Sequence, residues 1–528
     1  MKKLLTTTCL FVVTTIAIVS FIAPFVSAQE AKQAEPCESL KLLPLSDTTI
    51  TAAEFVPAGP FRAPGQAAAG AQAPAGARGQ AGDGAAQQAG PILPAYCRVA
   101  AVLKPSSDSN IAIEVWLPAA DWNGKFQAVG NGGWAGRISY GLMQLALREG
   151  YATASTDTGH KGGGDDASFA LGHPEKVVDF AYRSVHEMTV KAKTIIMAFY
   201  NRGPRLSYWM GCSTGGRQGL MEAQRYPEDF DGIIAGAPAN YHNHLTAWLL
   251  GAGVAALADQ AHSLSPTKIA LVNQSVLNAC DVRDGVKDGF LMDPRTCHFD
   301  PSMLLCREGD ADNCLTAPQL ETVRKFYAPA KTKTGELIYP GLELGSELGW
   351  TMGPEPFGIS LSGFRYAVHQ DPKWDWRTFD MERDTALADR NEGFINAVDP
   401  NLQAFKARGG KVLMYHGWSD PLISPENSIN YYSGVLAKMG PKQDSWLRLF
   451  MMPGMGHCGG GPGPNQSNVV GALERWRESG IAPDQIIASH VSNNRVDMTR
   501  PLCPYPQIAQ YKGTGSTNDA ANFVCKVP

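Results

Sequence analysis

The sequence predicts an α/β protein with a mostly parallel sheet that is interrupted by one large insertion. Between residues 96 and 240, strand-like segments alternate with helical ones, the pattern of a parallel sheet covered by helices on both faces. The alternation stops over residues 241–408 and returns over residues 409–528. With 528 residues, the chain can bury a large core and carry a second structural unit inserted into the first.

The N-terminus is predicted to be a secretory signal peptide that ends at Ala28. Lys2 and Lys3 precede an apolar stretch, and the small residues 26–28 are followed by the polar Gln29. The alternative is an uncleaved membrane anchor, because the stretch is nearly long enough to span a bilayer. We expect cleavage, which would give a secreted or periplasmic protein with no membrane contact.

The charges and cysteines exclude some classes of function. The 46 basic and 50 acidic residues give a net charge of −4 without a long basic run, so no surface for nucleic acid is expected. Of 11 cysteines, Cys9 belongs to the signal peptide, and the even number that remains favours five disulfides. Spacing suggests the pairs 280–297, 306–314 and 503–525 and leaves other connectivities open. No Cys or His spacing resembles a zinc site.

Residues 63–90 interrupt the first part of the chain. They are almost only Ala, Gly, Gln and Pro, and they lie between Cys37 and Cys97. Because this composition offers little apolar surface to bury, we expect a flexible loop. Ordered structure is expected to begin after it, with the strand-like runs YCRVAAVLKP and IAIEVWLP.

The other core elements follow in a regular order. The strand KFQAV leads into a glycine-rich loop, and GYATAST is a further strand. Apolar residues spaced by three or four predict a helix over residues 177–200. The strand RLSYWMG precedes a helix that ends at Pro227, and FDGIIAGAP is a strand again. After the insertion, GKVLMYHGW and SWLRLFMMPG return to the strand pattern.

A Gly-x-Ser-x-Gly pentapeptide, Gly211–Gly215, lies at the junction of a predicted strand and a predicted helix. The pattern alone is weak evidence, and its structural context decides its interpretation. A tight turn of this kind exposes the serine at the carboxyl edge of the sheet, and the glycines let strand and helix approach closely. We therefore predict that Ser213 is a nucleophile and not an incidental residue of a glycine-rich turn.

A serine nucleophile needs a histidine that accepts its proton and an acid that orients the histidine. In this kind of fold the order is Ser, acid, His, with each partner in a loop after a later strand. Asp420 follows the strand KVLMYHGW, and His457 follows WLRLFMMPG, so we predict that these two residues are the acid and the base. Asp157 and Asp231 compete for the role of the acid. His160, His186 and His416, of which His416 is the closest competitor for the base, are expected to be packed or hydrogen-bonded instead.

Acyl transfer also needs N–H donors that hold the developing oxyanion. The backbone N–H of Thr214, directly after the serine, is one predicted donor. A glycine N–H in the run GNGG is the other, with Gly132 preferred and Gly133 as the alternative.

Two cysteines adjoin the predicted catalytic residues. Cys212 precedes Ser213, and Cys458 follows His457. If the serine and the histidine lie about 3 Å apart, their neighbours fall within the roughly 5.5–6 Å Cα separation of a disulfide. We therefore predict a bridge between Cys212 and Cys458.

Three stretches resemble the tannase and feruloyl esterase family, namely GCSTGGRQGLMEAQRYPEDFDGIIAGAPA, HGWSD and GMGHC. The resemblance covers essentially the whole mature chain and implies an α/β-hydrolase core with a large inserted lid. It implies that Ser213, Asp420 and His457 form the catalytic triad and that Cys212 and Cys458 form the bridge beside it. It also implies a five-disulfide pattern, with 37–97 as the remaining pair.

The pattern of strands and helices and the family resemblance together predict the domain organisation. We expect a signal peptide over 1–28, the first part of the core over 29–240, the lid over 241–408 and the second part of the core over 409–528.

The family's lid holds a calcium ion, and the matching loop here is CDVRDGVKDGF. The resemblance implies carboxylate ligands from Asp281, Asp284 and Asp288 and carbonyl ligands from Val286 and Phe290, a set of hard oxygens that suits calcium. Considered alone, three aspartates in eight residues could be a solvated turn. The ion is expected to be structural, and no organic cofactor is expected.

The expected function is a secreted serine carboxylic-ester hydrolase. The resemblance implies small esters of aromatic hydroxy acids, feruloyl or galloyl, free or linked to polysaccharide or tannin. The alternatives are a hydrolase of the terephthalate monoester released from polyester and, in a different class, a non-catalytic calcium-stabilised binding protein. Lid aromatics could stack on the substrate ring or form the lid's own core; they are Trp350, Phe357, Phe364, Trp374 and Trp376.

Overall fold

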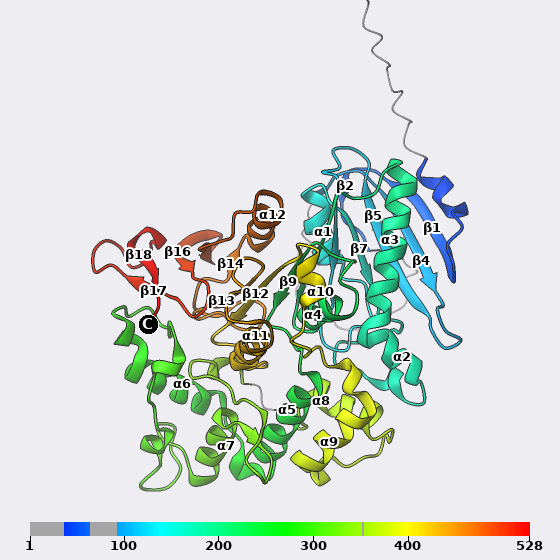
Figure 1. The fold of residues 1–528 in the computed structure, drawn as a ribbon. Coiled ribbons are helices and arrows are strands. Elements are labelled where there is room, and N and C mark those ends of the chain that lie inside the picture. The colour runs from blue at the N-terminus through cyan, green and yellow to red at the C-terminus, as the bar shows by residue number, and fades with distance from the viewer. Residues whose placement is uncertain (1–35, 64–91, 351–352) are drawn as a thin grey trace, which may run out of the picture. The chain divides into compact units, whose positions relative to one another are not determined.

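The computed structural model describes residues 36–63, 92–350 and 353–528, which fall in one compact unit. The predicted signal peptide and almost all of the predicted loop over 63–90 lie outside the described residues. A nine-stranded sheet runs through the unit in the order β1-β4-β5-β7-β6-β8-β9-β12-β13 (Figure 1).

The sheet is mostly parallel, as predicted. The pairs β7-β6, β6-β8, β8-β9, β9-β12 and β12-β13 are parallel, whereas β1-β4, β4-β5 and β5-β7 are antiparallel. The bounds are β1 (Thr48–Val56), β4 (Tyr96–Leu103), β5 (Ile111–Pro118), β6 (Lys125–Val129), β7 (Ala152–Thr156), β8 (Leu206–Cys212), β9 (Gly232–Gly236), β12 (Lys411–Gly417) and β13 (Leu447–Met452). Every residue of β9 is buried, as expected for a parallel strand that is covered on both faces.

Ordered structure begins earlier than the sequence analysis expected, and that expectation was wrong. A 3-10 helix, Cys37–Leu42, and the edge strand β1 precede residues 63–90, and Cys37 is bonded to Cys97 of β4. The sequence of β1, TTITAAEFV, contains few large apolar residues, and only Ile50 is buried. The strand is held by its main-chain pairing with β4, which hydrophobic patterning does not reveal.

Two groups of helices cover the sheet. Side chains of α3 (Ser184–Tyr200), α4 (Thr214–Arg225) and α11 (Pro425–Met439) join one apolar cluster with the sheet. Those of α1 (Tyr140–Arg148) and α12 (Val469–Ser479) join another. Neighbouring strand residues alternate between the clusters, with Ile233 in the first and Ile234 in the second, so these clusters lie on opposite faces. The helix predicted over 177–200 begins in α2 (Pro174–Val178) and passes through a π-turn before α3.

Most of the chain between β9 and β12 forms a separate group of helices on one side of the sheet, and its last helix, Gln403–Ala407, packs on α4 instead (Figure 1). This inserted segment has apolar clusters of its own. Its elements are α5 (His242–Ala256), α6 (Pro266–Cys280), α7 (Ala317–Tyr327), β10 (Ala330–Lys331), β11 (Leu337–Tyr339), α8 (Gly358–Ser362), α9 (Met381–Glu392) and α10 (Gln403–Ala407).

Small sheets complete the fold. Beyond the core, the chain forms β14 (Gln466–Ser467), β15 (Ile486–Ser492), β16 (Arg495–Leu502), β17 (Ile508–Tyr511) and β18 (Phe523–Lys526), and β2 (Gly59–Pro60) pairs with β3 (Ile92–Leu93). The structure contains five disulfides, which match the expected pairs: Cys37–Cys97, Cys212–Cys458, Cys280–Cys297, Cys306–Cys314 and Cys503–Cys525.

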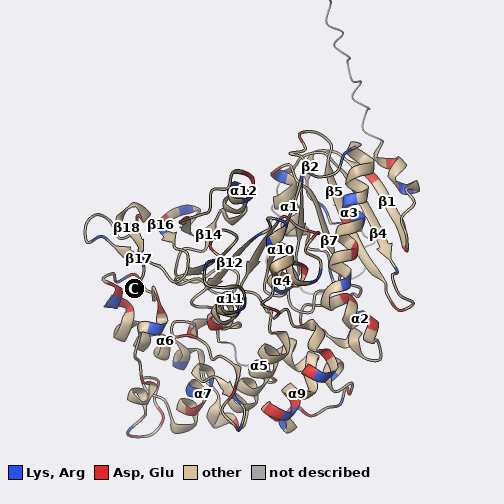
Figure 2. Ribbon diagram, viewed as in Figure 1, with Lys and Arg blue, Asp and Glu red and all other residues tan. Residues whose placement is uncertain are grey.

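The charged residues are distributed without a large region of one sign. Figure 2 shows basic and acidic residues interspersed along the outer helices and loops, with few on the central strands. Within the described ranges, no helix is long and apolar enough to cross a membrane.

Candidate active site

Ser213 lies at the sharp turn between β8 and α4. Its backbone has φ 62° and ψ −124°, a conformation that residues other than glycine rarely adopt. The flanking glycines permit it, because a Cβ on Gly211 would lie 2.4 Å from the carbonyl group of Gly215. The N–H of Ser213 donates to the Gly236 carbonyl of the next strand at 3.0 Å. The turn therefore has the strained strand-to-helix geometry of a nucleophile elbow.

The glycine-rich loop after β6 packs on the N-terminus of α4. The Thr214 hydroxyl donates to the Gly133 carbonyl at 2.7 Å. Gln218 braces the same loop, since its Oε1 accepts from the Asn131 N–H and its Nε2 donates to Asn131 Oδ1, each at 3.0 Å. Gln218 was not among the predicted site residues, and its position in the helix after the serine is the only sequence feature that points to it.

The two glycines considered for the oxyanion site have different surroundings. A Cβ on Gly133 would lie 2.1 Å from the Gly164 carbonyl oxygen, whereas no atom lies within 4 Å of a Cβ on Gly132. Open space beside Gly132 leaves room for a substrate oxygen. Thr214 is the first residue of α4, so its N–H has no partner inside the helix.

Asp420 lies in the loop after β12 and is fully buried. Its Oδ2 accepts from His457 Nδ1 at 2.8 Å, and His416 Nε2 lies 3.1 Å from the same oxygen. Its Oδ1 accepts from the N–H groups of Leu422 at 2.9 Å and Ile423 at 3.0 Å. The carboxylate is therefore held at both oxygens.

The two members of the Asp420–His457 pair shift each other's pKa in opposite directions. Burial would raise the pKa of Asp420, but His457 and His416 lower it well below its ordinary value. Burial would lower the pKa of His457, but the Asp420 carboxylate raises it above its ordinary value of 6.5. The pair thus favours an ionised acid beside a basic imidazole.

A disulfide connects the serine turn to the histidine loop. Cys212 and Cys458 are bonded with a Cα–Cα distance of 6.0 Å across a sequence separation of 246 residues. Each cysteine adjoins one of the predicted catalytic residues, so the bridge keeps Ser213 and His457 near each other. Among the described residues, no hydrogen bond joins the Ser213 hydroxyl to His457; such bonds often form only with substrate bound.

A cavity of about 450 Å³ adjoins His457. The core contributes Ser419 and His457 to its lining, and the inserted segment contributes Gly289, Phe290 and Leu348. A space between core and insertion, with a basic imidazole on its wall, can accommodate a small organic substrate.

The other residues considered for the catalytic acid and base have partners of their own. Asp157 accepts from two backbone N–H groups, Asp231 pairs with Arg477, and His160 stacks on Phe169. His416 is hydrogen-bonded, as expected, but its partner is Asp420, which sequence analysis did not foresee. The spacing of four residues between His416 and Asp420 in HGWSD is the sequence feature that could have indicated this contact.

The chain matches the family model described as tannase and feruloyl esterase over residues 97–358 and 356–526. It is 37% identical to an uncharacterized esterase of Xanthomonas campestris, over 94% of this chain and 92% of that protein. It is 38% identical to a probable feruloyl esterase B-2 of Aspergillus terreus, over 82% and 86% of the two chains.

The chain belongs to the tannase and feruloyl esterase family. The crystal structure of feruloyl esterase B from Aspergillus oryzae superposes with a TM-score of 0.82 at 32% identity, over 93% of this chain and 99% of that one. The core is thus an α/β-hydrolase core, and the protein is a carboxylic ester hydrolase.

The aromatic residues of the esterase's inserted segment that were considered for substrate stacking are mostly internal. Phe364 and Trp376 are almost completely buried in one apolar cluster, and Trp374 packs against it. Trp350 stacks on a phenylalanine of α7, and Phe357 lines a small cavity beside it. Phe364 and Trp376 therefore belong to the core of the inserted segment and are not available to a substrate ring.

The loop of the esterase expected to bind calcium is held in a tight curl. Gly285 and Gly289 have φ values of +89° and +86°, which favour glycine. Asp281 accepts from the N–H groups of Asp288 and Gly289, each at 3.1 Å. Asp288 Oδ2 accepts from the buried Arg500, while Asp288 Oδ1 is buried without a partner among the described residues.

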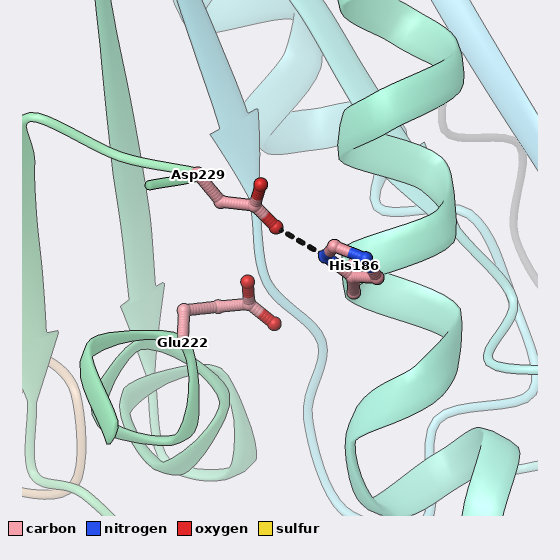
Figure 3. Close-up of side chains that lie close together, drawn as sticks. All are labelled: His186, Glu222 and Asp229. Carbon is pink, nitrogen blue, oxygen red and sulfur yellow. Dashed lines mark hydrogen bonds and ion pairs between the residues drawn. The ribbon is translucent and has the colours of Figure 1, made fainter. Parts of the chain in front are cut away.

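His186, Glu222 and Asp229 form another cluster in the esterase, between α3 and α4 (Figure 3). Their potential metal-donor atoms all lie within 4.8 Å of one another. His186 Nδ1 lies 2.7 Å from Asp229 Oδ2, and this carboxylate raises the histidine pKa although burial opposes it. Burial raises the pKa of Glu222 well above its ordinary value, and Asp229 raises it further. The His186–Asp229 contact gives two of these groups a partner, whereas both carboxyl oxygens of Glu222 are buried without a hydrogen-bond partner among the described residues.

Removing the Cys212–Cys458 bridge of the esterase is expected to be costly. Its loop is closed across 246 residues, so a Cys212→Ala/Cys458→Ala variant should lose about 5 kcal/mol of unfolding free energy. The matched control is Cys306→Ala/Cys314→Ala, whose separation of 8 residues predicts a loss of about 2–3 kcal/mol. Equilibrium unfolding in urea measures both, and equal losses would contradict the loop-closure argument.

Proposed function

We propose that the protein is an exported serine esterase that works through Ser213, His457 and Asp420. The observation that carries the proposal is the arrangement of the three residues. Ser213 occupies a strained turn, His457 donates to the buried Asp420 carboxylate, and a disulfide joins the residues next to the serine and the histidine. Five disulfides support export, because cytosolic thiols stay reduced.

The proposed reaction has two steps. Ser213 Oγ attacks the ester carbonyl while His457 Nε2 accepts the serine proton, and the resulting oxyanion is held by the N–H groups of Thr214 and Gly132. The alcohol leaves with the proton from His457. Water then attacks the acyl-serine, His457 accepts a proton from it, and the carboxylic acid is released as Ser213 is regenerated.

The proposed substrates are small esters of aromatic hydroxy acids, feruloyl or galloyl, free or carried by polysaccharide or tannin. Relatives named feruloyl esterase support this acyl class. The cavity beside His457 supports a small substrate, since its walls combine Phe290 and Leu348 with polar groups.

Initial rates on a panel of esters would test the proposal. The panel is methyl ferulate, methyl p-coumarate, methyl gallate and the monohydroxyethyl ester of terephthalate, with a fluorophosphonate probe to label the nucleophile. Preference for a hydroxycinnamate or gallate ester, together with labelling of Ser213, is the expected result. Preference for the terephthalate ester would replace the proposed acyl class, and labelling at another residue would overturn the proposed nucleophile.

The pH dependence follows from the His457 pKa. Only the neutral imidazole can accept the serine proton, and Asp420 raises the His457 pKa above its ordinary value of 6.5. We expect kcat/KM to fall as the pH drops through this raised pKa and to be constant above it. A kcat/KM profile for the preferred ester measures the transition; an acid limb well below pH 6.5 would contradict this assignment.

We also propose that the loop over 281–290 holds a structural calcium ion. Asp281, Asp284 and Asp288 would supply carboxylates, with the carbonyls of Val286 and Phe290, and the ion would keep the loop folded. The unpartnered buried Oδ1 of Asp288 supports this. The residues present fit a cation that prefers hard oxygen ligands.

Chelation should therefore destabilise the protein. Removal of an ion held at 100 times its Kd costs about 2.7 kcal/mol, so Tm should fall on treatment with EGTA and recover on addition of calcium. Asp288→Asn should abolish this response, whereas Asp300→Asn, an exposed helix cap in the same inserted segment, should preserve it. Metal analysis of untreated protein that finds no calcium, with a Tm unchanged by EGTA, would contradict the proposal.

A further inference from the structure

His416 adjoins the proposed triad from a fully buried position on β12. Its Nε2 lies 3.1 Å from Asp420 Oδ2 and 3.0 Å from the carbonyl oxygen of Ile423. Its Nδ1 lies 2.7 Å from the hydroxyl of Ser428, which projects from α11. Both the imidazole and Ser428 are completely buried, so no water completes these contacts from bulk solvent.

The partners determine where the protons lie. A carboxylate and a carbonyl can only accept, so His416 Nε2 must carry a proton. The Ser428 hydroxyl has no other hydrogen-bond acceptor among the described residues, so it donates to Nδ1. His416 is thus a neutral imidazole in the Nε2–H tautomer, which its acceptors at Nε2 require and the Ser428 hydroxyl completes at Nδ1.

We propose that His416 is a positioning residue for ester hydrolysis, an inference that rests on the proposed function. Hydrogen bonds connect four residues in the order Ser428–His416–Asp420–His457. Each donor in the chain points toward Asp420. Because His416 and His457 share the oxygen Oδ2, the bond from His416 limits how strongly the carboxylate attracts the Nδ1–H of His457.

Few other titratable groups act on this chain. The groups that face Asp420 are His416, His457 and Tyr339 of β11, whose own pKa is raised well above its ordinary value by burial and then by Asp420. Since this raised pKa keeps Tyr339 neutral near pH 7, Tyr339 does not contribute to the pH response of the chain.

The test is a set of pH profiles of kcat and kcat/KM for four variants. In His416→Leu the second donor to Asp420 Oδ2 is lost. The Asp420 carboxylate then attracts the His457 proton more strongly, and the orientation of the carboxylate is less firmly fixed. We expect kcat to fall about 10- to 100-fold with KM nearly unchanged, and the acid limb to move up by about one pH unit. His416→Gln, whose amide N–H can donate to Oδ2, should recover most of the rate and restore the limb.

Ser428→Ala tests the hydrogen bond at Nδ1 of His416. It should shift the acid limb in the same direction by a smaller amount, because an imidazole without the Ser428 donor at Nδ1 donates more weakly from Nε2 to Asp420 Oδ2. The double variant His416→Leu/Ser428→Ala should be no slower than His416→Leu alone, since Ser428 acts only through the histidine. If His416→Leu does not fold, Ser428→Ala and His416→Gln still carry the comparison.

Ser213→Ala, measured in parallel, distinguishes a failure of the role proposed for His416 from a failure of the proposed function. An unchanged acid limb in both His416→Leu and Ser428→Ala, or additive losses in the double variant, would overturn the role of His416 while Ser213→Ala remains inactive. Substantial activity in Ser213→Ala would instead overturn the proposed function itself.

Discussion

Ser213→Ala is expected to lower kcat by about 10⁵- to 10⁶-fold, the largest loss available from one substitution in this molecule. Without the hydroxyl no acyl-enzyme can form, and only the oxyanion donors and substrate binding remain to accelerate direct attack by water. The backbone strain at φ 62° is unchanged by removing one oxygen, so the turn itself should persist.

Initial rates on the preferred ester, together with loss of fluorophosphonate labelling, measure this effect. Ser445→Ala is the matched control, since Ser445 is exposed before β13 and should retain wild-type rates. A Ser213→Ala variant with more than about one hundredth of the wild-type kcat would contradict the assignment of the nucleophile.

Asp420→Asn is expected to lower kcat by about 10⁴-fold although the side chain keeps its shape. In the native site Oδ1 accepts from the Leu422 and Ile423 N–H groups, so the asparagine carbonyl would take that position. Its NH₂ group would then face His457 Nδ1–H, a donor against a donor. His457 would move its proton to Nε2 and could no longer accept the proton of Ser213.

The control for this variant is Asp231→Asn, the competing acid, whose contacts are the Ser207 N–H and Arg477. It should change kcat/KM little, because those contacts hold a strand end and a surface helix. Loss of activity in Asp231→Asn with retention in Asp420→Asn would reverse the assignment of the acid.

The sequence was most informative where a local pattern has one structural solution. The strands around Ser213 and before Asp420 and His457 could be predicted because buried parallel strands are short apolar runs that end in glycine or polar residues. The edge strand β1 could not, because it is stabilised by pairing with β4 and buries little of its own surface.

The contacts of individual side chains were less predictable. His416 and Asp420 are four residues apart, but only the turn after β12 brings the ring onto Oδ2. The cavity beside His457 combines Phe290 and Leu348 with residues of the histidine loop, and no local pattern connects positions so distant in sequence. Of the aromatics considered for substrate stacking, the sequence could not tell which ones the inserted segment uses for its own core.

The point at which the inserted segment joins the core has an evolutionary consequence. The chain leaves the sheet at the end of β9 and re-enters at β12, and these two strands are direct neighbours, with Lys411 paired to Gly232 and Tyr415 to Gly236. Because these strands are parallel, the exit after Gly236 and the re-entry at Lys411 lie at opposite edges of the sheet, and the segment has to return across the sheet. Changes of length or composition that preserve this return leave the register of the sheet unaltered. Substrate preference can thus diverge within such a lineage while the proposed acyl-transfer residues, which lie in turns and loops after core strands, stay in place.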